Sequence, residues 1–304
     1  MLHKIRNLAL FGLGCLLAAA LLIVLVGLPY ARAYGLVHPA RVSINRAPAD
    51  LGLPYEDIQL TTSDGLTLTA WYIPPRNGVV VICAHGLGGN RAQFLAEAIF
   101  LHQNKYGVLL LDLRNHGESE GNVTTLGLYE TKDVAAAVEY IGQREQANTA
   151  IAAFGHSMGA ATVLMAAAQL PEIDAVIAVS PFTSVEDNVS EGMRTLTGLD
   201  PRFFAPLVLF FGQREAGVAI SAVRPVNVIA RISPRPVLLI HGAKDETIPV
   251  RNSYALYEAA RDPKELVVYE GVGHGGFVFQ EPKQYPQTVL NFLEYLLELS
   301  DRTR

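Results

Sequence analysis

The sequence predicts a doubly wound α/β domain built on a mostly parallel sheet. Three observations lead to this fold class. Residues 79–84 form a continuous apolar run, which is typical of a strand buried on both faces of a parallel sheet. Similar runs alternate with helix-length segments along the chain, as expected where helices connect parallel strands. A Gly-His-Ser-Met-Gly turn joins one such strand to a helix at 155–159.

The predicted elements follow one another in a simple order. An entry hairpin turns at Asp64-Gly65, a dipeptide that favours tight turns between strands. Strands are expected at 58–62, 66–72, 79–84, 108–113, 149–154, 175–179, 237–240 and 266–269. Helices are expected at 91–103, 131–143, 160–168, 253–261 and 287–299.

One segment, 181–235, is too long to be a plain connection inside a compact domain. It contains the strongly apolar stretch 201–212, which has no place in the predicted sheet. Either it forms an extra pair of helices that pack on the domain, or it forms a helical lid over the active site. We expect a lid insertion and keep simple packing as its rival.

The N-terminus divides into a short tail and a long apolar run. Residues 8–30 carry no charge and are long enough to cross the bilayer core, which takes about 20 residues. A cleaved signal peptide is the rival interpretation, because Ala31-Arg32-Ala33 resembles a cleavage site. The expected organisation is a tail at 1–7, a transmembrane anchor at 8–30, a linker at 31–54 and a catalytic domain at 55–304.

The basic residues before the apolar run bear on its orientation. Lys4 and Arg6 favour a cytoplasmic N-terminus, so the catalytic domain is expected outside the cytoplasm. Arg32, Arg41 and Arg46 lie beyond the run and act against this bias. The expected location is therefore a membrane, with a single N-terminal anchor and an extracytoplasmic domain.

Composition excludes several classes of function. The chain has 24 basic and 29 acidic residues, a net charge of −5, and no basic block, which argues against binding nucleic acid. Cys15 lies in the apolar run and Cys83 in a predicted central strand, so a disulfide between them is not expected. The spacing of the histidines and cysteines fits no metal site, and we expect no metal and no cofactor.

The turn at 155–159 carries the chemistry. It follows a buried strand and precedes a helix, and its glycines remove the Cβ atoms that would collide in so tight a turn. This is the strand–turn–helix context of the G-x-S-x-G motif, which holds a nucleophilic serine clear of the sheet. Ser157 is therefore the candidate nucleophile.

A serine nucleophile needs a base and an acid that orients the base. In this motif's architecture the order along the chain is Ser, then Asp or Glu, then His. Asp245 follows the late strand at 237–240 and is the preferred acid, with Glu246 as its neighbouring alternative. His274 follows the last predicted strand and is the histidine downstream of Asp245, so it is the expected base.

Acyl transfer also needs backbone N–H groups that stabilise an oxyanion. We expect one from Met158, directly after the nucleophile, and one from Leu87 in the glycine-rich loop after the strand at 79–84. A phosphate-binding loop is the rival interpretation, but this loop has neither the lysine nor the glycine spacing of one.

Together these residues resemble the α/β-hydrolase superfamily, from about Tyr55 to the C-terminus. Residues 112–119, Asp-Leu-Arg-Asn-His-Gly-Glu-Ser, are similar to its D-x-R-x-H-G-x-S segment. Asp64-Gly65 and 71–74 are similar to the entry hairpin of a subgroup with membrane-tethered bacterial hydrolases and ABHD-type lipid and thioester hydrolases. The resemblance implies a hydrolase acting on esters, thioesters, lysolipids or peptides.

The expected function is a serine hydrolase, carboxylesterase- or lipase-like, that cleaves carboxylic esters with hydrophobic acyl groups through an acyl-enzyme. Its expected substrate is a small-molecule or lipid-like ester. A peptidase, thioesterase or acyltransferase on the same triad is the first alternative, and a non-catalytic binding protein of this fold is the second. The apolar residues of the insertion expected to bind substrate are Phe203, Phe204, Leu207 and Phe210.

Overall fold

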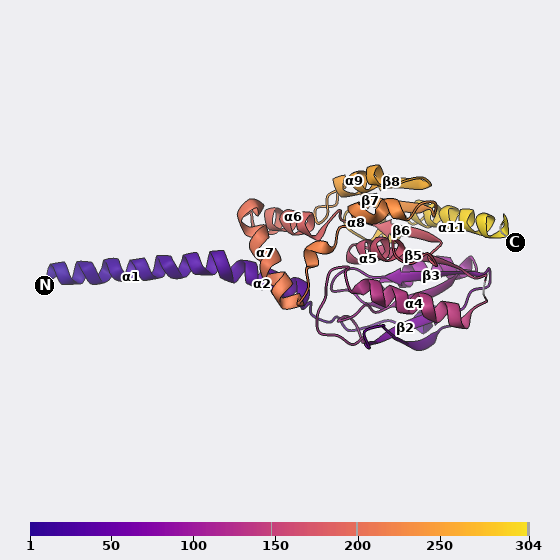
Figure 1. Ribbon diagram of the computed structural model, residues 1–304, viewed down its shortest axis with the longest axis horizontal. Coiled ribbons are helices and arrows are strands. Elements are labelled where there is room, and N and C mark those ends of the chain that lie inside the picture. The colour runs from indigo at the N-terminus through magenta and orange to yellow at the C-terminus, as the bar shows by residue number, and fades with distance from the viewer. Residues whose placement is uncertain (147, 199, 303–304) are drawn as a thin grey trace.

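The computed structural model describes residues 1–146, 148–198 and 200–302 (Figure 1). Eight strands of this part of the chain form one sheet in the order β1-β2-β4-β3-β5-β6-β7-β8. Strand β2 pairs antiparallel with β1 and β4, and all other pairs are parallel. The strands are β1 Glu56–Thr61, β2 Thr67–Ile73, β3 Val79–Ala84, β4 Gly107–Leu111, β5 Ala150–His156, β6 Ala175–Val179, β7 Val237–Gly242 and β8 Lys264–Tyr269.

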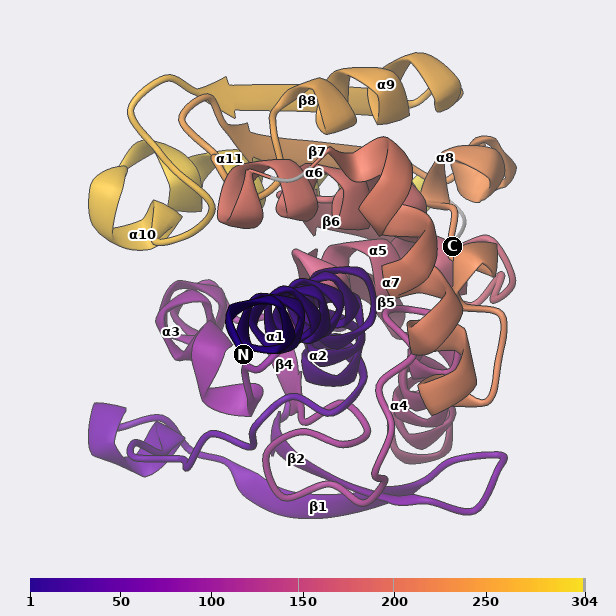
Figure 2. The same cartoon turned by 90° about the vertical axis from the view of Figure 1, so that its left-hand side faces the viewer.

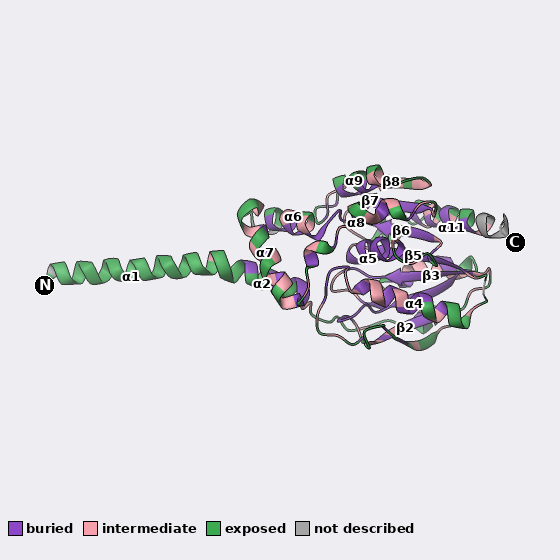
Figure 3. Ribbon diagram, viewed as in Figure 1, coloured by how far each residue is buried: buried purple, intermediate pink, exposed green. Residues whose placement is uncertain are grey.

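Helices cover both faces of the sheet, so the central strands are buried on both sides (Figures 2 and 3). Helices α3 and α11 belong to one apolar core, and α4, α5 and α9 belong to the other. The helices of the domain outside the insertion are η3 Arg91–Phe94, α3 Leu95–Gln103, α4 Glu130–Arg144, α5 Met158–Ala167, α9 Arg251–Ala259, α10 Phe277–Gln280 and α11 Gln284–Arg302. A short 3-10 turn, η2 Pro48–Leu51, precedes β1.

The predicted doubly wound, mostly parallel sheet is confirmed. Every expected strand is present, with ends shifted by a few residues. The helix expected at 91–103 begins as the 3-10 turn η3, where the Asn90 side chain accepts a hydrogen bond from the Ala92 N–H.

A single long helical rod precedes the domain and projects from it (Figure 1). It comprises α1 Leu2–Leu22, a π-helical turn η1 Ile23–Gly27 and α2 Leu28–Val37. Within the described residues, His3–Val37 is the one helix long and apolar enough to cross a membrane. Its 35 residues span about 52 Å, which exceeds the bilayer core of about 30 Å, so part of the helix would remain outside. The outer part, α1, is exposed from His3 to Leu22 (Figure 3).

The expectation of a linker from residue 31 is wrong for its first part. Residues 31–37 continue the helix as α2, and Ala33, Leu36 and Val37 are buried against the domain. The end of α2 is held from two sides: the Val37 carbonyl accepts the Thr124 N–H at 2.8 Å, and His38 Nε2 lies 3.3 Å from Glu215 of the insertion. The composition of this segment suggested a linker. It forms a helix because burial of the apolar face of α2 against the domain stabilises the helical conformation.

The segment 181–235 is helical, as expected of an insertion. Its elements are α6 Val185–Thr197, α7 Pro201–Ala216, η4 Ile220–Ala222, α8 Pro225–Val228 and η5 Ile229–Arg231. Helix α7 packs along α2, with the Tyr30 and Phe211 rings edge to face at 5.6 Å. The insertion therefore lies at the base of the projecting rod, where Figure 1 shows both helices together.

Candidate active site

Ser157 stands at a strained turn between β5 and α5. Its backbone has φ 55° and ψ −116°, a conformation that non-glycine residues rarely adopt. A Cβ on Gly155 would lie 2.2 Å from the Gly159 carbonyl oxygen, and a Cβ on Gly159 would lie 2.0 Å from that of Ala84. Both glycines are therefore required by close backbone contact, and the turn presents Ser157 beyond the end of the sheet.

Two further predicted residues meet Ser157. His274 Nε2 lies 2.9 Å from Ser157 Oγ, and His274 Nδ1 lies 2.7 Å from Asp245 Oδ2. Because an ionised carboxylate only accepts hydrogen bonds, Nδ1 carries the ring proton and Nε2 is left as an acceptor for the serine hydroxyl. Three residues far apart in the sequence thus form one hydrogen-bonded chain.

Asp245 lies on the loop after β7, where hydrogen bonds hold its carboxylate in place. Its Oδ1 accepts the N–H groups of Thr247 and Ile248 at 2.9 and 2.8 Å. Burial raises the pKa of Asp245, but hydrogen bonds from His241 and His274 outweigh burial and hold that pKa well below its usual range. Asp245 is therefore ionised at neutral pH and can accept the hydrogen bond from His274 Nδ1. Glu246, the alternative acid, is exposed, and no hydrogen bond or ion pair between it and His274 is found among the described residues.

The side chain of His156 supports the backbone at His274. His156, beside the nucleophile, donates from Nε2 to the His274 carbonyl at 2.7 Å. Its Nδ1 lies 2.9 Å from the Gln93 side-chain nitrogen, and the Gln93 side-chain oxygen accepts the Gly86 N–H at 2.9 Å. Burial, followed by the nearby His274 ring, lowers the pKa of His156 to about 4, so its imidazole is neutral. This arrangement links the nucleophile turn, the loop after β3 and the base.

The loop after β3 forms a tight turn beside the nucleophile. The Gly89 N–H donates to the Gly86 carbonyl at 3.0 Å, and Gly88 has φ 71°. A positive φ at this position is the requirement of a type II turn, which explains the glycine. Leu87 and Met158, the predicted oxyanion donors, border the same cavity as Ser157. Within the described chain, neither of their N–H groups donates a turn or loop hydrogen bond, so both are unoccupied.

Ser157 and His274 open into a cavity of about 640 Å³. Its apolar walls come from α2, the loop after β3, the insertion and three further segments, and consist of Leu36, Leu87, Leu126, Met158, Phe182 and Ile248. Two of its polar side chains, Asn188 and Thr195, belong to α6. Arg32 of α2 also borders it, although no pattern in the sequence indicates that this arginine lies near the site.

The four apolar residues of the insertion that were expected to bind substrate do not border this cavity. Phe203, Phe204, Leu207 and Phe210 are absent from its walls, and Phe203 and Phe210 are 69% and 51% exposed. Helix α7 is apolar on most sides, so its sequence does not distinguish the face that packs on α2 from the face left open. The residues of the insertion that reach the cavity are instead Phe182, which precedes α6, and Asn188, Gly192 and Thr195 on α6.

The remaining histidines near the strand ends are structural. His85 Nδ1 donates to the Gly86 carbonyl and its Nε2 accepts the Leu113 N–H. His241 bonds to Ser253 and to the Ile248 carbonyl, and thereby shapes the loop that carries Asp245. Burial lowers the pKa values of both His85 and His116, which keeps these rings neutral.

The segment 112–119 also has a structural role. Asp112, fully buried, accepts the Arg91 N–H at 2.6 Å, pairs with the Arg91 guanidinium and accepts the Glu118 N–H at 2.9 Å. Arg114 bonds Asp64 of the entry hairpin and Asp133 of α4. The two motifs noticed in the sequence thus hold loops together around the carboxyl end of the sheet.

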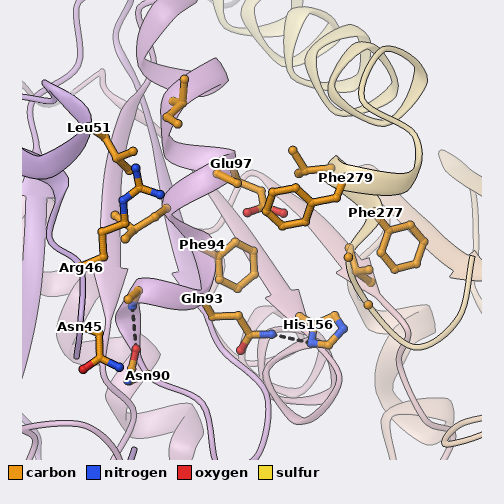
Figure 4. Close-up of a pocket in the computed structure, with 18 of the residues that line it drawn as sticks. Asn45, Arg46, Leu51, Asn90, Gln93, Phe94, Glu97, His156, Phe277 and Phe279 are labelled. Carbon is orange, nitrogen blue, oxygen red and sulfur yellow. Dashed lines mark hydrogen bonds between the residues drawn. The ribbon is translucent and has the colours of Figure 1, made fainter. Parts of the chain in front are cut away.

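A second cavity, of about 590 Å³, lies next to the first (Figure 4). Gln93 and His156 border both cavities, so their hydrogen bond forms part of the wall between them. The second cavity is mostly apolar, with Phe94, Phe277 and Phe279 around the carboxylate of Glu97. Burial raises the pKa of Glu97 to about 7, and its nearest polar partner is the Tyr285 hydroxyl at 3.3 Å.

Comparisons with known proteins identify the family of this chain. A model of the alpha/beta hydrolase fold family matches residues 79–224. WAV2 of Arabidopsis thaliana, an alpha/beta hydrolase domain-containing protein, is 31% identical over 81% of this chain and 81% of its own. The chain belongs to the alpha/beta-hydrolase family. YqkD of Bacillus subtilis is 30% identical over 76% of each chain.

Solved structures of this family place the chain among esterase-like hydrolases. The esterase Pf2001 of Pyrococcus furiosus superposes with a TM-score of 0.73 at 28% identity, covering 86% of this chain and 98% of its own. This alpha/beta hydrolase therefore has the fold of an esterase over nearly the whole domain. The family model ends inside the insertion, at residue 224, so it does not include Asp245 and His274.

Proposed function

We propose that this alpha/beta hydrolase is a serine esterase that works through an acyl-enzyme. The observation that carries the proposal is the hydrogen-bonded chain from Ser157 through His274 to Asp245, at 2.9 and 2.7 Å, facing a cavity. A serine hydroxyl is a weak nucleophile until a neighbouring base takes its proton. The neutral Nε2 of His274 is positioned to be that base.

In the proposed reaction, Ser157 Oγ attacks the ester carbonyl while its proton moves to His274 Nε2. The carbonyl oxygen becomes an oxyanion, and the N–H groups of Leu87 and Met158 stabilise it. Collapse breaks the bond to the alkoxy group, which leaves as an alcohol with the proton from His274. Water then repeats these steps on the acyl-Ser157, giving a carboxylic acid and free enzyme. Asp245 keeps the ring tautomer and stabilises the imidazolium at both stages.

The walls of the cavity support a substrate with a hydrophobic acyl group. Apolar residues from three parts of the chain, among them Leu36, Leu126 and Phe182, surround the space next to Ser157. Each buried methylene of an acyl chain would contribute about 0.8 kcal/mol to binding. We therefore propose that the acyl pocket is this cavity, with α6 as its lid, and not the outer face of α7.

The rod supports attachment to a membrane. We propose that α1 spans the bilayer and that the domain lies outside the cytoplasm, because Lys4 and Arg6 precede the apolar run. Phe203 and Phe210 are exposed on α7, the helix that packs along α2 at the base of the rod, and we propose that they meet the lipid surface. Protease added to sealed right-side-out vesicles should digest the domain. Complete protection in sealed vesicles would place it in the cytoplasm.

A substrate panel separates this proposal from its alternatives. Purified protein should hydrolyse carboxylic esters of increasing chain length faster than matched thioesters and anilides. Faster cleavage of the anilide would favour a peptidase, faster cleavage of the thioester would favour a thioesterase, and transfer to an added alcohol in preference to water would favour an acyltransferase. Failure to turn over any of them would favour the non-catalytic binding protein.

A further inference from the structure

The rod contributes directly to the wall of the catalytic cavity. Arg32 and Leu36 of α2 are four residues apart, so they lie on one face of the helix, and both border the cavity that contains Ser157. The segment that leads to the membrane is thus also part of the candidate active site. A residue placed there can contact the substrate.

Arg32 has no partner in the described structure. Its guanidinium reaches α6, where a Cβ on Gly192 would lie 3.3 Å from Arg32 Nη2, yet the described residues give it neither an ion pair nor a hydrogen bond. By contrast, several other arginines of the domain pair with carboxylates: Arg91, Arg114, Arg144, Arg224 and Arg251. Arg32 is exposed to solvent where it borders the cavity, and the protein atoms around its guanidinium lower its pKa by partial desolvation.

The neighbouring side chains leave Arg32 available to a ligand. Asn188 lies one turn before Gly192 on α6 and borders the same cavity, and no side-chain hydrogen bond is found for it among the described residues. Glu246, on the loop after β7, also borders the cavity, and no ion pair between it and Arg32 is found among the described residues. Asp245 is already engaged by His274. The cavity therefore holds one free guanidinium and one free amide on adjoining helices.

We propose that Arg32, assisted by Asn188, binds an anionic group of the ester substrate, a phosphate or a carboxylate, and so selects anionic esters. This inference rests on the proposed esterase function. A guanidinium presents paired N–H donors that match the oxygens of either anion, and such charge-assisted bonds are among the strong ones in proteins. An anion would supply the counter-charge that the protein itself does not give Arg32.

The position of Arg32 along the rod favours a lipid as the source of this group. Arg32 is the first charged residue after Arg6, so it lies where the apolar part of the helix ends. If α1 spans the bilayer, this level is that of the lipid phosphates. A lysolipid held there would place its phosphate near Arg32 and its acyl ester near Ser157.

Matched pairs of esters test the proposal on the full chain in neutral detergent micelles. One pair is 1-dodecanoylglycerol and its 3-phosphate, and the other is ethyl hexanoate and monoethyl adipate. The members of each pair share the ester and differ by one anionic group. The first pair presents a lipid phosphate and the second a carboxylate on a soluble ester, so the two arms separate the sources.

Wild-type protein should have a higher kcat/KM for the anionic member of a pair. Arg32→Gln should lower kcat/KM for that member by about 10- to 100-fold, mainly through KM, and lower kcat/KM for the neutral member by a much smaller factor. Arg32→Lys should keep most of the preference. Arg46→Gln is the matched control: it removes the same charge beside the neighbouring cavity and should have little effect. A higher kcat/KM for the anionic member in the first pair alone would identify a lipid phosphate as the group that Arg32 binds.

Equal losses of both members in Arg32→Gln, or equal effects of Arg32→Gln and Arg46→Gln, would overturn the inference. A binding measurement tests the anion site independently of the proposed esterase function. The Ser157→Ala protein should bind dodecanoylglycerol 3-phosphate more tightly than dodecanoylglycerol, and Ser157→Ala with Arg32→Gln should lose that difference. If no ester is hydrolysed while this difference persists, the esterase function fails and the anion site stands. If esters are hydrolysed and the difference is absent, the anion site fails.

Discussion

The imidazole of His156 donates its Nε2–H to the main-chain carbonyl of His274 at 2.7 Å. Ser180 Oγ lies 3.2 Å from the same carbonyl, so two side chains hold the base's backbone in place. His156 itself adjoins Ser157 and reaches the loop after β3 through Gln93. One hydrogen-bonded network thus joins the turn at Ser157, the backbone of His274 and the loop after β3.

The first prediction concerns this network. His156→Ala removes the donor to the His274 carbonyl, so the base loses a restraint on its position while the cavity keeps its walls near Arg32 and Leu36. We expect kcat on a neutral ester to fall by about 10- to 100-fold with KM nearly unchanged. His102→Ala, which changes a histidine of α3 that lies outside the cavity, is the control and should retain kcat. A His156→Ala protein with wild-type kcat would show that the network does not position the base.

The second prediction separates the two adjacent acids. Asp245→Asn leaves the size of the side chain unchanged but removes the charge that orients His274, and we expect kcat to fall by about 10⁴-fold. Glu246→Gln should turn over neutral esters at close to the wild-type rate, because Glu246 forms no hydrogen bond to the base in the described structure. Steady-state kinetics on one neutral ester measures both. A severe loss of kcat in Glu246→Gln, together with an active Asp245→Asn protein, would show that Glu246 is the acid that orients His274.

The third prediction concerns pH and stability. Burial raises the pKa of Glu97 to about 7, whereas a glutamate in an unfolded chain titrates near 4.3, about its model-peptide value. Between these pH values the folded protein keeps a proton that the unfolded chain has released, so the free energy of unfolding falls as pH rises through this window. Glu97→Gln removes the titration and should raise the free energy of unfolding at pH 8 by about 1–3 kcal/mol.

Denaturant unfolding at pH 5, 6 and 8 measures this effect. Glu97→Gln should show a smaller decline in unfolding free energy from pH 5 to pH 8 than the wild type. Glu258→Gln, which changes an exposed glutamate on α9, should keep the wild-type decline. Identical pH dependence in wild type and Glu97→Gln would mean that Glu97 is ionised in the folded protein at neutral pH.

The fourth prediction concerns the outer face of α7. Phe210 is 51% exposed and does not border the catalytic cavity, so Phe210→Ser should leave the relative rates on short and long soluble esters unchanged. If this face meets the bilayer, the variant should hydrolyse an ester embedded in vesicles more slowly than the wild type. Tyr254→Ser is the matched control, because Tyr254 is equally exposed, at 51%, but lies on α9. A selective loss on long-chain soluble esters would instead return Phe210 to the acyl pocket.

Much of the candidate site could be predicted because its three main residues each follow a strand, and the order of these strands can be recognised in the sequence. Ser157, Asp245 and His274 come after β5, β7 and β8, and parallel strands bring their carboxyl ends to one edge of the sheet. The turn glycines around Ser157 gave the strongest signal, since backbone contact excludes any side chain there.

What could not be predicted depends on packing between distant segments. Arg32 was part of a possible cleavage site in the sequence, and only the packing of α2 against the insertion brings it to the cavity. Phe203 and Phe210 illustrate the reverse case, since a helix with apolar residues on most of its sides gives no period from which its buried face could be inferred. The link between Gln93 and His156 joins side chains 63 positions apart and leaves no local pattern.

The most direct test of the account is the reaction of Ser157 with a fluorophosphonate probe. After incubation of the full chain, peptide mass spectrometry should find the adduct on Ser157, with close to one probe bound per chain. Ser157→Ala should bind no probe and hydrolyse no ester, while its thermal unfolding stays near that of the wild type. An adduct on a different residue, or ester turnover by Ser157→Ala close to the wild-type rate, would contradict the proposed mechanism.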